Sequence, residues 1–378
     1  MKIKLLLTII LVTNSLLAQN NIWNNLDKGE YNVGFRVLSR YDSTRTVNNF
    51  QAERPIQISN WYPAQDSDHT QTMKYKDYFL LSSSEIDFDV PDDLKDSSIT
   101  EYKNMLLQYG VSEYAFSEWF NTQMLAERNA IPIKKKFPLI VVAQGNYQSA
   151  HHQAFLCEFL ASYGYVVVTT PSQTRISGQM TDNSEAVESA EEQVKDMEFT
   201  IHSLQKFDNT DFNNIGLIGH SFGGRSILLL QMINENVKCL VSLDGGLGLN
   251  TGIEDLKKSL EFNSKKMNVP LLHIYEDSEE FIKPDFTLID SFVNSKIFLI
   301  KIDDMHHFYF SSIGFASGTI EGFSPASENL ATKYKLICDL TRDFLNAVFD
   351  NTDKEIENLK GEFSAIADST EFITFQYK

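Results

Sequence analysis

Cysteine and long apolar runs are both scarce in this 378-residue sequence. Its three cysteines, Cys157, Cys239 and Cys338, lie far apart, and the sequence has no Cys-x-x-Cys pair and no Cys/His cluster. This pattern argues against a dense disulfide framework and a structural zinc site, and it predicts three buried free thiols. Beyond the N-terminus, no stretch reaches the roughly 18 apolar residues of a membrane-spanning helix, so no transmembrane segment is expected.

Basic side chains are also in the minority. Lys and Arg number 33 against 51 Asp and Glu, which gives a formal net charge of −18. Contacts to phosphate need clustered Lys and Arg, so this balance excludes unassisted binding to nucleic acid or to an anionic membrane surface. Hydrophobic residues make up 42% and charged residues 22% of the chain, a balance that is typical of a globular protein and argues against global disorder.

The N-terminus has the features of a secretory signal. Lys2 and Lys4 precede an apolar run at residues 5–12, and the small residue Ala18 stands before Gln19. The pattern predicts cleavage after Ala18 and a secreted or periplasmic protein. The alternative is an uncleaved anchor, for which the apolar run is too short to cross a bilayer.

A regular alternation of apolar strands and amphipathic helices begins at residue 137. Strands are expected at 138–143, 165–170, 215–219, 237–243, 270–275 and 297–302, and helices at 151–163, 184–204, 223–233 and 328–348. Two further strands are expected upstream, at 34–41 and 56–61. The alternation predicts an α/β fold with a mostly parallel sheet and helices on both of its faces.

The remaining segments suggest the domain organisation. Residues 64–135 mix polar stretches with aromatics and contain two helix-like segments, near 99–109 and 114–126. We interpret them as an insertion that either covers a site or decorates the surface. The expected organisation is therefore a signal at 1–18, a main domain at 19–350 and a C-terminal extension at 351–378, whose structure the sequence does not predict.

The strongest chemical signal is the run Gly219-His220-Ser221-Phe222-Gly223-Gly224. It fits Gly-x-Ser-x-Gly, follows a predicted buried strand and opens a predicted helix. Glycines two residues before and after the serine let the strand and the helix approach closely around a strained residue. The pattern therefore predicts Ser221 as a nucleophile at the carboxyl edge of the sheet. The alternative is an ordinary serine in a glycine-rich turn.

A serine nucleophile needs a base and a carboxylate that orients the base. In this arrangement the acid and then the histidine follow the serine along the chain. His306 and His307 follow the last predicted parallel strand, and either can be the base. Asp244 and Asp277 end two earlier strands at the same edge and are both candidate acids, although an aspartate there is often only a turn former.

The negative charge that develops on the substrate needs two backbone N–H donors. One is expected from Phe222, which follows the nucleophile, and the other from Asn146, in the loop Gln144-Gly145-Asn146 after the first buried strand. Gly145 permits the tight turn that presents the Asn146 N–H. A plain turn is the alternative for this loop.

These segments together resemble the α/β-hydrolase superfamily, and more closely the platelet-activating factor acetylhydrolase and dienelactone hydrolase-like secreted esterases. The resemblance spans most of residues 30–348, and its specific parts are the 219–224 run and the following Leu243-Asp244-Gly245. It implies Ser221 as nucleophile, Asp244 as acid and His307 as base, since similar esterases carry His-x-x-Phe and Phe310 lies three residues after His307. Asp277 is kept as the alternative acid and His306 as the alternative base. Relatives usually have His-Gly where this chain has Gln144-Gly145.

The expected function is that of a secreted serine esterase that cleaves carboxylic esters through an acyl-enzyme. A small-molecule or lipid-like ester is the expected substrate, and lipid degradation is an expected role. No metal or organic cofactor is expected. Two alternatives stay open: a serine peptidase or amidase on the same fold, and a catalytically silent secreted binding protein.

Overall fold

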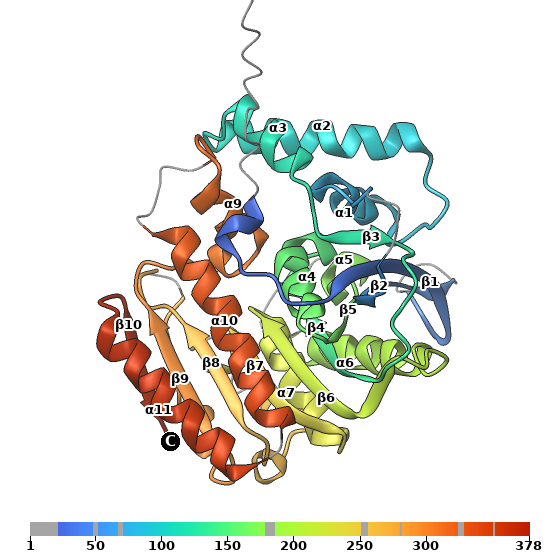
Figure 1. The fold of residues 1–378 in the computed structure, drawn as a ribbon. Coiled ribbons are helices and arrows are strands. Elements are labelled where there is room, and N and C mark those ends of the chain that lie inside the picture. The colour runs from blue at the N-terminus through green and yellow to red at the C-terminus, as the bar shows by residue number, and fades with distance from the viewer. Residues whose placement is uncertain are drawn as a thin grey trace, which may run out of the picture.

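The computed structural model describes residues 22–47, 52–66, 71–177, 186–250, 256–279, 282–323, 329–350 and 352–378. The predicted signal at 1–18 lies outside these residues. Within them, the dominant feature is a sheet of ten strands in the order β10-β9-β8-β7-β6-β4-β5-β2-β1-β3 (Figure 1). The strands are β1 (Asn32–Thr46), β2 (Glu53–Ala64), β3 (Ala126–Arg128), β4 (Phe137–Ala143), β5 (Val166–Thr169), β6 (Thr210–His220), β7 (Val237–Leu243), β8 (Leu271–Tyr275), β9 (Ile297–Ile302) and β10 (Ile373–Tyr377).

The centre of the sheet is parallel. Strands β4 to β9 pair with one another in parallel, whereas β2 joins β5, β1 joins β2 and β10 joins β9 in antiparallel register. The expected mostly parallel sheet is confirmed. The carboxyl ends of the parallel strands meet at one edge, and the loops that follow them carry the candidate site.

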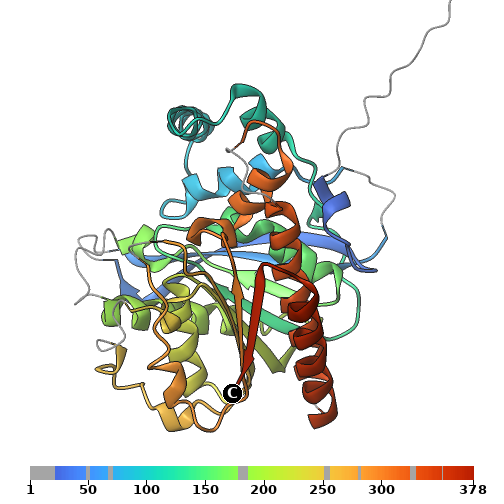
Figure 2. The ribbon, with the colours of Figure 1, turned by 90° about the vertical axis from the view of Figure 1, so that its left-hand side faces the viewer.

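Helices cover both faces of this sheet, as expected. They are α1 (Tyr75–Leu81), α2 (Asp92–Gln108), α3 (Glu113–Asn121), α4 (Ala154–Ser162), α5 (Gln173–Ser177), α6 (Ala186–Ser203), α7 (Gly223–Ile233), α9 (Ser312–Thr319), α10 (Leu330–Phe349) and α11 (Asp353–Ser369). Successive residues of a strand point to opposite faces, so in β4 Ile140 and Val142 enter one core while Leu139 and Val141 enter the other. Helices α4, α10 and α11 pack on the first core and α6 and α7 on the second (Figure 2).

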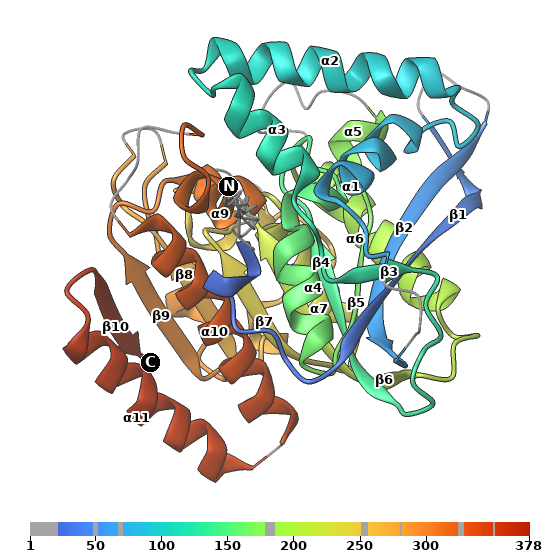
Figure 3. The same cartoon turned by 45° about the horizontal axis from the view of Figure 1, so that its top comes forward.

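The predicted insertion contains α1, α2, α3 and the short strand β3, which extends the sheet beside β1. Helix α2 lies at the outside of the molecule (Figure 3). It begins at Asp92, earlier than the predicted segment at 99–109, and Leu106 is its one buried residue. A helix with almost no buried face has no apolar periodicity, which is why its first turns were not predicted.

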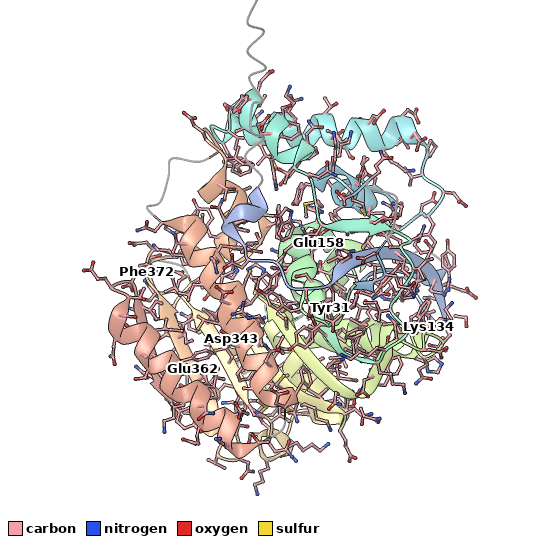
Figure 4. The ribbon with its side chains drawn as sticks, viewed as in Figure 1. Tyr31, Lys134, Glu158, Asp343, Glu362 and Phe372 are labelled. Carbon is pink, nitrogen blue, oxygen red and sulfur yellow. The ribbon has the colours of Figure 1, made fainter. Side chains whose placement is uncertain are left out.

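A buried carboxylate on α4 joins this segment to the sheet domain. Glu158 is labelled on this helix in Figure 4. It accepts hydrogen bonds from the backbone N–H groups of Leu125 at 2.6 Å and Ala126 at 3.3 Å, and another from the hydroxyl of Tyr78 on α1. The Tyr78 hydroxyl in turn accepts from the indole N–H of Trp61 on β2, at 2.9 Å. Burial raises the pKa of Glu158 to about 7, and the hydrogen bonds oppose that rise.

The last residues of the chain, unplaced by the sequence, complete the sheet. Helix α11 precedes β10, and Phe375 of β10 stands opposite Ile300 of β9. The ring of Phe363 on α11 lies 5.8 Å from that of Phe298, edge to face, so the helix and the edge strand share the first core. Residues 352–378 thus close one side of the sheet.

Candidate active site

A sharp turn between β6 and α7 carries Ser221. Its φ of +53° lies in the left-handed region, which is strained for a residue with a side chain. The turn is tightly packed, because a Cβ on Gly219 would lie 2.6 Å from the carbonyl carbon of Gly223, and a Cβ on Gly223 would lie 2.2 Å from the carbonyl oxygen of Ala143. The two glycines therefore let β6, α7 and β4 meet behind the serine.

One histidine reaches this serine. The Nε2 atom of His307 lies 2.7 Å from Ser221 Oγ, and its Nδ1 atom lies 2.5 Å from Asp244 Oδ2. A carboxylate can only accept, so Nδ1–H donates to Asp244, and Nε2 is left to accept from the serine hydroxyl. The structure thus joins Ser221, His307 and Asp244 in one hydrogen-bonded chain.

The acid of this chain is deeply buried. Asp244 follows β7 with a left-handed φ of +44°, and its side chain has no exposed surface. Its Oδ1 atom also accepts from the backbone N–H of Glu276, at 3.4 Å. Burial raises the pKa of Asp244, while the hydrogen bond from His307 opposes the rise.

The alternative base and acid lie elsewhere. The side chain of His306 is half exposed, and its Nδ1 atom lies 3.7 Å from Glu279 Oε1. Asp277 is exposed as well and pairs with Lys301 at 3.3 Å. Neither residue has a hydrogen bond to Ser221 or His307 within the described part of the chain.

The loop after β4 passes directly over the serine. A Cβ on Gly145 would lie 3.0 Å from the Cβ of Ser221, and Asn146 is the next residue. The backbone N–H groups of Asn146 and Phe222 have no acceptor among the described residues. The side chain of Gln144, where relatives usually carry histidine, is fully buried and donates to Thr169 Oγ1 at 3.0 Å. It therefore points away from the site.

Comparisons with known proteins agree with this architecture. The chlorophyllase family model matches residues 130–274, a segment that contains Ser221 and Asp244 and ends before His307. The structure of a ferulic acid esterase from Streptomyces cinnamoneus superposes with a TM-score of 0.58 and 18% identity, over 84% of this chain and 89% of that one. No curated protein matches the sequence.

The chain has the α/β-hydrolase fold. The resemblance inferred from the sequence is thereby confirmed at the level of the fold. In the described ranges of the chain, no group of three His, Cys, Asp or Glu side chains is arranged to hold a metal ion. None of the helices in those ranges is both long and apolar enough to cross a membrane.

Three residues around the candidate site were not singled out from the sequence. Glu279 Oε1 accepts from the backbone N–H of His307 at 3.1 Å, while His220 and Gln148 contact each other behind the serine. His220 occupies a variable position of the motif and Gln148 lies four residues beyond Gln144, so neither carries a pattern of its own. Only the closeness of His220 to Ser221 in the chain could have drawn attention to it.

Proposed function

We propose that this chain is a secreted serine hydrolase that cleaves carboxylic esters. The observation that carries the proposal is the hydrogen-bonded chain from Ser221 through His307 to Asp244. This arrangement of hydroxyl, imidazole and carboxylate activates a serine wherever it occurs on unrelated folds. The two comparisons, with a chlorophyllase family and a ferulic acid esterase, support an ester as the substrate.

The reaction follows from the distances. Ser221 Oγ attacks the ester carbonyl carbon while His307 Nε2 takes the hydroxyl proton, and Asp244 stabilises the imidazolium that forms. The N–H groups of Phe222 and Asn146 hold the oxyanion of the tetrahedral intermediate. Collapse of the intermediate breaks the bond to the alcohol, and the alcohol leaves with the proton from His307. The acyl group stays on Ser221. Water, deprotonated by His307, then releases the acid and restores the serine.

The surrounding segments are given roles in the same proposal. Residues 19–350 form the hydrolase domain, and residues 64–135 act as a cap. A hydrogen bond from the Tyr75 hydroxyl to the carbonyl oxygen of His151, at 3.0 Å, supports the role of the cap, because His151 lies shortly after the loop of Asn146 in the chain. Residues 1–18 direct export and are removed after Ala18. N-terminal sequencing of the protein from an extracellular or periplasmic fraction tests that cleavage.

The proposal is tested by labelling the purified protein with a fluorophosphonate probe and mapping the modified residue. The same preparation is assayed on a short alkyl ester, a feruloyl ester and the anilide of one acyl group. Modification of Ser221 with ester turnover far above anilide turnover is expected. Comparable anilide turnover would make the protein an amidase or peptidase, and absence of both labelling and turnover would make it a binding protein.

A further inference from the structure

A buried glutamine closes the loop that carries Asn146. The side-chain Oε1 of Gln148 accepts from the backbone N–H of Gly145 at 2.9 Å, and the backbone N–H of Gln148 donates to the Gly145 carbonyl oxygen at 3.1 Å. Gln148 is 5% exposed, so water does not compete for these bonds. The loop is therefore held in its turn by its own side chain.

The same oxygen atom faces the residue that precedes the nucleophile. His220 Nδ1 lies 2.8 Å from Gln148 Oε1. On the other side of the ring, Nε2 lies 3.2 Å from the carbonyl oxygen of His307, and the two imidazole rings stack with centroids 5.2 Å apart at 28°. His220 thus contacts the loop of Asn146, the loop of His307 and, through the backbone, Ser221.

The hydrogen atoms of this contact can be assigned. Gln148 Oε1 accepts from Gly145, so it is an acceptor for His220 too, and His220 must donate from Nδ1–H. Burial lowers the pKa of His220 to about 3, which leaves the ring neutral with one N–H near neutral pH. The bond to Gln148 takes that hydrogen, so Nε2 carries a lone pair and makes no hydrogen bond to the His307 carbonyl oxygen. Stacking of the two rings is then the contact that joins His220 to His307.

We propose that Gln148 and His220 are positioning residues, which keep the Asn146 N–H and the His307 imidazole in register around Ser221 Oγ. We name this pair the Gln148–His220 bridge. The inference rests on the function proposed above, because it assigns roles within the same site.

Strand order explains why such a bridge is needed. The loop of Asn146 follows β4, next to β6, whereas the loop of His307 follows β9, which β7 and β8 separate from β6. The ladder of the sheet does not fix the distance between two loops beyond its edge. A displacement of about 1 Å at a reacting group can cost about 10²-fold in rate, so side-chain contacts across the edge affect catalysis.

The test compares two substitutions of equal size at one position. Gln148→Met removes the acceptor, whereas Gln148→Glu keeps an oxygen that accepts from both Gly145 and His220. The control is Gln231→Met, which removes another buried glutamine whose side chain donates to the Lys266 carbonyl oxygen at 3.0 Å, away from Ser221. Each variant is assayed for kcat and KM on one ester, for the rate of fluorophosphonate labelling and for amide hydrogen exchange in the 144–153 peptide.

Gln148→Met is expected to lower kcat and the labelling rate about 10- to 100-fold with KM nearly unchanged, and to speed exchange in the 144–153 peptide. Gln148→Glu should recover most of the rate and the protection, and Gln231→Met should leave both as in the wild type. Wild-type kcat in Gln148→Met, or equal losses in the Met and Glu variants, would overturn the inference.

Two further readouts keep the result decisive. His220→Phe keeps a stacked ring and loses the Nδ1–H donor, so it should reproduce the kcat loss if Gln148→Met does not fold. A wild-type protein without labelling or turnover would refute the proposed function, whereas hydrogen exchange would still show whether the bridge orders the loop. Unchanged hydrogen exchange of the 144–153 peptide in both Gln148→Met and His220→Phe would refute the bridge itself.

Discussion

The imidazole of His307 stands between Ser221 Oγ, 2.7 Å from its Nε2, and Asp244 Oδ2, 2.5 Å from its Nδ1. The hydrogen bond to Asp244 fixes the tautomer, and that tautomer leaves a lone pair facing the serine hydroxyl. Each member of this hydrogen-bonded chain can be tested against a residue of the same chemical type outside it.

Replacing Ser221 with Ala should lower ester turnover by up to about 10⁶-fold, because the attacking oxygen is removed. The thermal midpoint should change little, since the Ser221 side chain serves the site rather than either core. Ser259→Ala is the control: that hydroxyl donates to Glu191 at 2.6 Å and takes no part in the site. Wild-type turnover in Ser221→Ala would refute the serine mechanism.

Asp244→Asn should reduce kcat by about 10⁴-fold, because an amide no longer fixes the His307 tautomer. Asp277→Asn should stay close to the wild type, since this carboxylate is exposed and pairs with Lys301. Steady-state kinetics of both variants on one ester give the ranking. The reverse order would move the acid from the end of β7 to the end of β8.

His307→Ala should abolish turnover, whereas His306→Ala should keep most of it, because His306 contacts Glu279 and not Ser221. Steady-state kinetics of both variants on one ester at one pH provide the measurement. Collapse of His306→Ala with survival of His307→Ala would reverse the two roles.

The buried carboxyl of Glu158 should make stability depend on pH. Burial raises its pKa from 4.5 to about 7, so the folded state holds this proton more tightly than the unfolded chain. The free energy of unfolding should therefore fall as the pH rises from about 4.5 to about 7, by on the order of 2–3 kcal/mol from this group.

Urea unfolding at pH 5 and pH 8 measures this dependence. Glu158→Gln should flatten it, because the amide has no proton to lose in this range. Glu362→Gln, at an exposed position of α11, is the control and should keep the wild-type slope (Figure 4). A slope that is the same in wild type and Glu158→Gln would show that other groups produce it.

Gly219→Ala should destabilise the fold by about 1–3 kcal/mol and disturb Ser221, because the new Cβ would lie 2.6 Å from a backbone atom of Gly223. Gly361→Ala, in the middle of α11 with no atom within 4 Å of the added Cβ, should instead stabilise it by about 0.5–1 kcal/mol. Thermal or urea unfolding of the two variants distinguishes these opposite signs.

The sequence by itself determined the features that depend on neighbours along the chain. Apolar runs and helical spacing predicted β4 to β9 and the helices α4, α6 and α7, since burial leaves a local pattern. The turn at Ser221 was predictable for the same reason: the glycines that let β6 and α7 meet stand two residues on either side of the serine.

Only the tertiary structure decided which side chains meet. The residues alone left two carboxylates as candidate acids and two histidines as candidate bases. The structure joins His307 to Asp244, 63 residues away, and to Ser221, 86 residues away. It also placed β10 beside β9, Glu158 beneath β3 and Gln148 against His220. Periodicity records which face of an element is buried, but contacts between distant segments depend on strand order and loop path, which leave no local pattern in the sequence.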